Sequence, residues 1–240
     1  MCGRFALSAM LTDIAEEFST KSQPDRTLPV DWNIKPTQEI YQIRNNHQGE
    51  REIAIASWGM IAPWSKDETE ALRSQSMAIN ARSETVHEKP TFRRAFQSQR
   101  CLVPATGYYE WATSLGQYKT KQPFFISRDD GRLISFAGIY DRWRSPDGKV
   151  RESIAIITRD AVGELESVHN RMPVIMPADR WDTWLDQGLT EVEEVRALME
   201  FPNPDAHLRF WPVKDLVNSI RNSGQDLAEP ITLGDTEVLF

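Results

Sequence analysis

Seven short segments rich in β-branched and aromatic residues occupy the middle of the chain, and each is five to eight residues long. They cover residues 39–44, 51–58, 100–105, 107–111, 123–127, 133–140 and 153–158. The turn sequences DDGR (129–132) and SPDGK (145–149) separate the later segments and predict antiparallel hairpins. So many short strands in succession favour an antiparallel sheet that curves on itself.

Helical patterns surround these strands at residues 9–18, 90–97, 161–168, 178–187 and 191–200. Ser8 is expected to cap the first of them. No internal repeat or Gly/Ser linker divides the chain, so we expect one domain. The fold class is therefore α+β, a single domain with a curved, barrel-like antiparallel β-sheet core flanked by helices. The tail after Pro230 has no strong pattern.

Composition excludes several classes of protein. No run of 18 apolar residues is present, and the N-terminus lacks the basic and apolar regions of a signal peptide. Cys2 and Cys101 are the only cysteines, too few for a disulfide framework or a cysteine-rich zinc site. We therefore expect a cytoplasmic protein that uses no metal and no cofactor.

Charge is unevenly distributed along the chain. The net charge is −7, which argues against a nucleic-acid partner. Residues 76–125, however, hold seven basic and three acidic side chains, a local charge of +4, whereas residues 177–240 hold five and thirteen, a local charge of −8. A basic middle permits a local anionic ligand despite the overall sign, although a solvated charged face explains it equally well.

A cysteine directly behind the start methionine is the first candidate for chemistry. Removal of Met1 would leave Cys2 at the amino terminus, with an α-amine and a thiol on adjacent carbons. Such a pair can form an imine with an aldehyde and then close to a thiazolidine ring. The alternative is a cysteine present by chance at a frayed chain end.

Three further stretches combine polar and aromatic residues. Asn80 and Arg82 lie two apart in MAINARSET, so an extended segment presents both on one face. Glu110 is flanked by aromatic residues in PATGYYEW, and partial burial would raise its pKa toward a value useful in acid–base chemistry. His169 lies in SVHNRMPVI, at the end of a helical pattern. A turn or cap for Asn80, solvent for Glu110 and a structural place for His169 remain the alternatives.

Tryptophans beside basic residues indicate a surface for unpaired bases. For Trp64 and Trp111 such a surface is favoured, with a place in the core as the alternative, whereas Trp181, Trp184 and Trp211 are assigned to the core.

Nine stretches, in order from residue 1 to about 231, resemble the SRAP domain family, the SOS response-associated peptidases that process abasic sites. They are MCGRFAL, WNIKPTQ, WGMIAPW, INARSET, FRRAFQSQRCLVPATGYYEW, KQPFF, FAGIYDRW, SVHNRMPVIM and VNSIRNSGQDLAEPI. The resemblance implies an SRAP domain at 1–231 and a tail at 232–240.

The resemblance also implies a chemistry for four of the residues. Family members expose Cys2, which attacks the ring-opened aldehyde of an abasic site in single-stranded DNA and forms a thiazolidine crosslink that shields the lesion. Asn80 would orient the sugar and Cys2, and Glu110 would position the α-amine and shuttle protons. His169 would act as a general acid on the sugar ring oxygen. An imine at C1′ also permits β-elimination, so a lyase activity is expected, and the family name implies peptidase activity and autolytic loss of Met1.

The DNA contacts implied by the resemblance come from seven residues: Arg4, Asn33, Pro36, Trp64, Arg82, Arg93 and Trp111. Four positions differ from the usual family pattern, namely Lys35, Ala62, Asn170 and Arg159, and none of them is one of the four proposed catalytic residues. We expect a monomer, because nothing indicates a coiled coil or an exposed apolar repeat.

Two other functions compete with crosslinking. A cysteine peptidase or amidohydrolase could use Cys2 with His169, and a non-catalytic single-strand binder would need neither.

Overall fold

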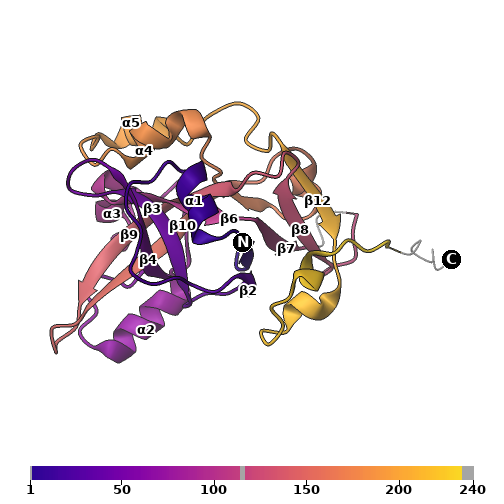
Figure 1. Ribbon diagram of the computed structural model, residues 1–240, viewed down its shortest axis with the longest axis horizontal. Helices are drawn as coiled ribbons and strands as arrows, with labels where there is room; N and C mark the ends of the chain where they lie inside the picture. The colour runs from indigo at the N-terminus through magenta and orange to yellow at the C-terminus, as the bar shows by residue number, and fades with distance from the viewer. Residues whose placement is uncertain (1, 114–116, 234–240) are drawn as a thin grey trace.

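The computed structural model describes residues 2–113 and 117–233. Two sheets dominate it, with five strands in one and seven in the other. Figure 1 shows the larger sheet on the left, the smaller on the right and the N-terminus between them. No helix among the described residues is long and apolar enough to cross a membrane.

The larger sheet closes into a barrel. Its neighbours follow the order β11-β10-β4-β3-β6-β9, and β9 pairs with β10 to complete the ring. The strands are β3 (Glu39–Asn45), β4 (Arg51–Trp58), β6 (Arg100–Ala105), β9 (Ile134–Arg144), β10 (Val150–Asp160) and β11 (Arg171–Pro173). β5 (Asn80–Arg82) also pairs with β10. The α+β fold with a barrel-like core is confirmed, although β10 runs parallel to β4 and β5 in an otherwise antiparallel sheet.

The smaller sheet has the order β12-β8-β7-β1-β2. Its strands are β1 (Phe5–Leu7), β2 (Asp31–Ile34), β7 (Gly107–Trp111), β8 (Pro123–Arg128) and β12 (Leu208–Pro212). All four pairings are antiparallel. The N-terminal strand β1 therefore lies between β2 and β7, paired on both sides.

The helices are short. They are α1 (Leu11–Glu17), α2 (Glu68–Met77), α3 (Arg93–Ser98), α4 (Trp181–Leu185) and α5 (Val192–Ala197), with 3₁₀ turns η1 (Gly163–Ser167), η2 (Ala178–Arg180), η3 (Asp215–Asn218) and η4 (Gln225–Ala228). The five helical patterns thus correspond to α1, α3, η1, η2 with α4, and α5, each shorter than its pattern. No sequence pattern predicted α2, because its apolar face is weak; only Ala71 and Gln75 of this helix are buried.

Two local predictions were wrong. Met10, not Ser8, precedes the first helix, where its N–H donates to the Asp13 carboxylate, while Ser8 bonds to Thr106 across the sheet. SPDGK does connect the paired strands β9 and β10, but DDGR joins β8 to β9, which belong to different sheets. A turn sequence specifies a reversal of the chain and not which strands pair after it.

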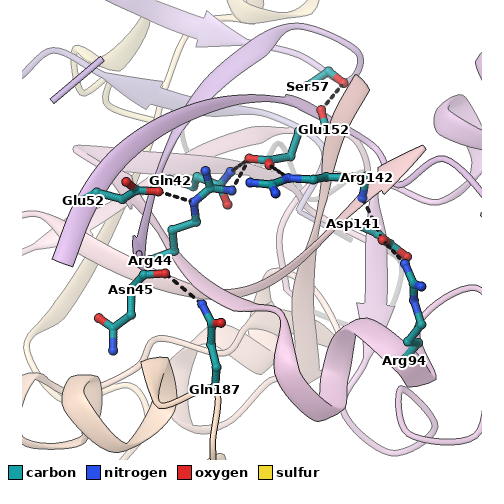
Figure 2. A network of polar contacts seen from close by, with 10 residues as sticks. All are labelled: Gln42, Arg44, Asn45, Glu52, Ser57, Arg94, Asp141, Arg142, Glu152 and Gln187. Carbon is teal, nitrogen blue, oxygen red and sulfur yellow. Dashed lines mark hydrogen bonds and ion pairs between the residues drawn. The ribbon is translucent and has the colours of Figure 1, made fainter. Parts of the chain in front are cut away.

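Polar side chains fill one end of the barrel. Figure 2 shows the Glu152 carboxylate between three donors, where it accepts from Gln42 Nε2, from Arg44 Nη1 at 2.6 Å and from Arg142 Nε at 2.7 Å. Arg44 Nε also donates to Glu52 at 2.7 Å. We call Gln42, Arg44, Glu52, Arg142 and Glu152 the barrel-end network.

Candidate functional site

The N-terminal segment runs beside β7 and brings Cys2 toward Glu110. Phe5 pairs with Tyr108, and the Tyr109 N–H donates to the Arg4 carbonyl at 2.9 Å. Cys2 is fully buried. Burial raises the pKa of its thiol, and the negative charge of Glu110 raises that pKa further. The thiol is therefore neutral in the resting protein.

Glu110 is a buried carboxyl with an unusual pKa. Its side chain lies on β7 and the residue is 4% exposed. Loss of hydration on burial raises its pKa from 4.5 to about 7, so both protonation states are populated near neutral pH. Tyr108, two residues earlier on the same strand, is also buried. Burial is the main cause that raises the pKa of its phenol, and the nearby Cys2 and Glu110 groups raise that pKa further.

Asn80 reaches Cys2 from the barrel. β5 carries it, paired in parallel with β10 through Ile156. Its Nδ2 donates to the Cys2 carbonyl at 2.8 Å. Its Oδ1 is buried and has no hydrogen-bond partner in the described part of the chain. The Asn80 amide is thus fixed through its nitrogen, and its buried oxygen can accept a hydrogen bond from a ligand.

His169 lies just before β11, which pairs with the same C-terminal part of β10 as β5 does. It follows η1, its backbone N–H donates to Leu165, and the Thr113 N–H just beyond β7 donates to the Val168 carbonyl at 3.0 Å. The His169 Nδ1 accepts from the Arg171 N–H at 2.9 Å, which leaves the proton of the neutral ring on Nε2. Burial lowers the pKa of this imidazole to about 4, so it is neutral at pH 7.

Arg171, for which no role was predicted, joins the elements around His169. Its guanidinium bonds Glu84 Oε1 at 2.7 Å, Asp160 Oδ1 at 2.5 Å and the Thr158 carbonyl at 2.8 Å. These contacts join β11 to β10 and to the segment after β5. A buried arginine beside two carboxylates is a tertiary pattern, and its only sequence signal was membership of HNRMP.

Two of the predicted DNA-contacting residues are exposed, and a third is half-buried. Trp64 is 57% exposed in the loop between β4 and α2, where the Trp143 Nε1 bond to the neighbouring Ser65 carbonyl fixes the loop. Arg82 is exposed on β5, two residues beyond Asn80. Pro36 is half-buried in the turn from β2 to β3.

Three others are directed into the protein. Arg4 Nη1 donates to Asn33 Oδ1 at 2.7 Å and to the Val217 carbonyl at 3.0 Å, and its guanidinium lies over the Trp111 ring at 6.0 Å. Trp111 is half-buried and donates from Nε1 to Asn218 Oδ1 at 2.7 Å. Asn33 is 2% exposed. Its side chain is therefore not presented to a ligand at the surface.

The structure does not bring Arg93 together with the other site residues. It is exposed on α3, a helix that packs against β6 and β9 and contacts Trp184 of α4 through Phe96. The basic middle of the chain is also less available than its count indicates. Arg100 is buried and donates to five backbone carbonyls, and Arg94 pairs with Asp141 at 2.5 Å.

One group in the described part of the chain has the composition of a metal site, and it lies away from these residues. Asp129, Asp130 and His207 place one ligand atom each within 4.8 Å of one another. All three are exposed, and Arg128 already pairs with the Asp130 carboxylate.

A family model described as SOS response associated peptidase (SRAP) matches residues 1–220. The chain belongs to the SRAP family. Abasic site processing protein YoqW of Bacillus subtilis is 35% identical over 230 residues, which cover 95% of this chain and 99% of that protein. Abasic site processing protein YMR114C of Saccharomyces cerevisiae is 31% identical over 99% of this chain and 70% of its own length.

Solved structures share the SRAP fold of this chain. A crystal structure of a protein from Bacteroides thetaiotaomicron matches with a TM-score of 0.83 at 26% identity, covering 96% of this chain and all of that one. A second, from Bordetella bronchiseptica, matches with a TM-score of 0.75 at 28% identity, over 89% of this chain and all of that one.

Proposed function

We propose that this SRAP protein reacts covalently with abasic sites in single-stranded DNA through Cys2, once Met1 has been removed. The observation that carries the proposal is the convergence of Asn80 and Glu110 on a buried Cys2. The names of the relatives, abasic site processing proteins, support the same substrate.

The chemistry needs an amine, a thiol and a group that exchanges protons. The α-amine of Cys2 attacks C1′ of the open-chain sugar, and the carbinolamine loses water to give an imine. The thiol sulfur then adds to the imine carbon, and its proton passes to the nitrogen as the thiazolidine ring closes. Glu110, with a pKa of about 7, both accepts and returns protons near neutral pH.

Two neighbours supply the orientation. Asn80 Nδ2 fixes the Cys2 carbonyl, while its buried Oδ1 accepts a hydrogen bond from the sugar or the amine. His169 is neutral at pH 7 and carries its proton on Nε2, so it acts as a hydrogen-bond donor to the sugar ring oxygen and favours ring opening. Outside this buried centre, Trp64 and Arg82 present a ring for stacking and a cation for phosphate.

A cysteine peptidase mechanism fits the site less well. Such enzymes pair a thiolate with an imidazolium, and each member stabilises the charge of the other. Here burial raises the pKa of the Cys2 thiol and lowers that of His169 to about 4, so both groups are neutral at pH 7.

The test is a crosslinking assay with an abasic-site single-stranded oligonucleotide, read on a denaturing gel and by intact-protein mass. Wild-type protein lacking Met1 should give a shifted band that survives denaturation, and Cys2→Ala should give none. Cys2→Ala retains an N-terminal amine, so it should still cut the strand slowly by β-elimination. The absence of a covalent band from Met1-free wild-type protein would refute the proposal, and peptide hydrolysis lost in Cys2→Ser would favour the peptidase.

A further inference from the structure

The C-terminal part of the chain folds back over β1, which follows Cys2, and over β7, which carries Glu110. We call residues 213–231 the C-terminal strap; it follows β12 and contains η3 and η4. Val217 and Leu227 are fully buried in a cluster with Ala6 of β1 and Tyr109 of β7. In Figure 1 the strap is the yellow segment below β7 and β8. It therefore covers the outer face of the small sheet.

Asn33 is a buried polar link between β2 and the strap. Its Nδ2 lies within hydrogen-bond distance of three strap carbonyls, Asn222 at 2.7 Å, Ser219 at 3.0 Å and Val217 at 3.5 Å. Its Oδ1 accepts from Arg4 Nη1 at 2.7 Å. Both polar atoms of a 2% exposed side chain are thus used within the protein. A DNA phosphate could reach neither atom without displacing these partners.

Arg4 carries this link to the reactive end of the chain. It lies two residues from Cys2, and its own carbonyl accepts from the Tyr109 N–H, one residue before Glu110. Its guanidinium also donates to the Val217 carbonyl of the strap at 3.0 Å. A second link joins β7 to the strap, because the Trp111 Nε1 donates to Asn218 at 2.7 Å. The segment that contains Cys2 and the strand that carries Glu110 are therefore both bonded to the strap.

We propose that Asn33 is a positioning residue that holds Cys2 against Glu110 by fastening Arg4 to the C-terminal strap, and that it does not contact DNA. The inference rests on the proposed crosslinking function for its kinetic consequence only. Placement of Cys2 by the strap is a property of the free protein. A displacement of about 1 Å between reacting groups can reduce a rate by about 100-fold.

The experiment compares Asn33→Ala with Gln42→Ala. Each removes a buried amide, but Gln42 belongs to the barrel-end network and bonds Glu152. The crosslinking rate constant is measured at saturating abasic-site oligonucleotide, and the Kd is measured with an oligonucleotide containing tetrahydrofuran, which has no aldehyde. Asn33→Ala should slow crosslinking at least about 10-fold and leave the Kd within about threefold. Gln42→Ala should change neither by more than about twofold.

Asn218→Ala extends the test to an exposed position where folding is not at risk. It breaks the Trp111 link alone and should slow crosslinking by a smaller factor, again without weakening the binding of DNA. A weaker Kd with an unchanged rate constant in Asn33→Ala would overturn the inference and make Asn33 a DNA contact. Equal loss of rate in Asn33→Ala and Gln42→Ala would also overturn it, because general destabilisation would then explain both.

Alkylation of the two cysteines separates this inference from the proposed function. Iodoacetamide labelling followed by peptide mass spectrometry reports the exposure of Cys2 and Cys101, both buried in the wild type. Asn33→Ala should accelerate labelling of Cys2 relative to Cys101. If the wild type fails to crosslink while this change occurs, the proposed reaction falls and the positioning role stands. Unchanged labelling of Cys2 would refute the positioning role in either case.

Discussion

Glu110 shows how burial of one side chain determines both reactivity and stability. Its folded-state pKa of about 7 lies above the unfolded value of 4.5. The buried neutral carboxyl therefore contributes its full stability below pH 4.5, and that contribution is lost as the pH rises through about 7. Glu110→Gln removes this dependence. Relative to wild type, the variant should gain up to about 3 kcal/mol in unfolding free energy between pH 4.5 and pH 8.

Urea unfolding of both proteins at pH 4.5 and pH 8 checks this sign. The same variant should crosslink at least about 100-fold more slowly, since the proton-exchanging group is lost. A stability difference that does not change with pH would show that Glu110 is hydrated in solution.

Asn80 contributes to the crosslinking rate through one hydrogen bond and one buried acceptor, and this contribution can be measured separately from the binding of DNA. Asn80→Ala removes the bond to the Cys2 carbonyl and the unpaired Oδ1 together. We expect crosslinking to slow by about 10- to 100-fold, corresponding to roughly 1.4 to 2.7 kcal/mol in the activation free energy. Single-turnover kinetics at saturating DNA measure it. Arg82→Ala is the comparison, because the loss of an exposed cation should weaken the binding of DNA and leave the rate at saturation unchanged.

At the scale of the element, the loop from β4 to α2 depends on one glycine. Gly59 has φ +113°, and a Cβ there would lie 2.2 Å from the Gln75 carbonyl oxygen of α2. Gly59→Ala should therefore cost about 3 kcal/mol or more in unfolding free energy, from backbone strain and the forced displacement of α2. Gly148→Ala is the control. Its φ is also positive, at +86°, but nothing lies within 4 Å, so about 1 kcal/mol is expected.

Denaturant unfolding of the two glycine variants measures these losses of unfolding free energy. Equal losses would mean that the loop before α2 moves aside freely. In that case Gly59→Ala should also leave Trp64 in place, and the binding of DNA should be unaffected.

Most elements could be predicted from local pattern, and the errors lie where pairing partners are distant. All seven predicted strands are present in the structure. They could be predicted because each has an alternating or continuous run of apolar residues. β1, β2, β5, β11 and β12 were not predicted, since they are three to five residues long and their partners lie elsewhere in the chain. The helix α2 escaped notice because it covers the barrel with few apolar residues. Short elements carry too few residues to reveal a period.

At the scale of the whole molecule, the reactive centre could be predicted only in part. The motifs identified Cys2, Asn80, Glu110 and His169. In the structure Asn80 bonds the Cys2 carbonyl, and, in addition to burial, the charge of Glu110 raises the pKa of the Cys2 thiol. The role of Asn33 could not be predicted, because its partners lie more than 180 residues away in the strap. The number of basic residues at 76–125 overestimated the charge available to an anionic ligand for a related reason. Whether an arginine such as Arg100 faces DNA or five carbonyls depends on tertiary packing.

The barrel-end network gives the last prediction, because it joins β3, β4, β9 and β10 by side-chain bonds that involve none of the four proposed catalytic residues. Glu152→Ala leaves the Arg44 guanidinium and the Gln42 amide without their shared acceptor in a largely buried setting. Removing one partner of a buried ion pair typically costs about 3 to 5 kcal/mol, and we expect the lower end because Arg44 keeps Glu52. Asp182→Ala is the control, since that carboxylate pairs with Arg51 but is 90% exposed, and it should cost less than about 1 kcal/mol. Denaturant unfolding measures the unfolding free energy of both variants, and crosslinking at denaturant concentrations below the unfolding transition should be the same for wild type and both variants.

An equal loss of unfolding free energy in the two variants would place the barrel-end charges in water. Slower crosslinking in Glu152→Ala would show that the barrel and the reactive centre are coupled.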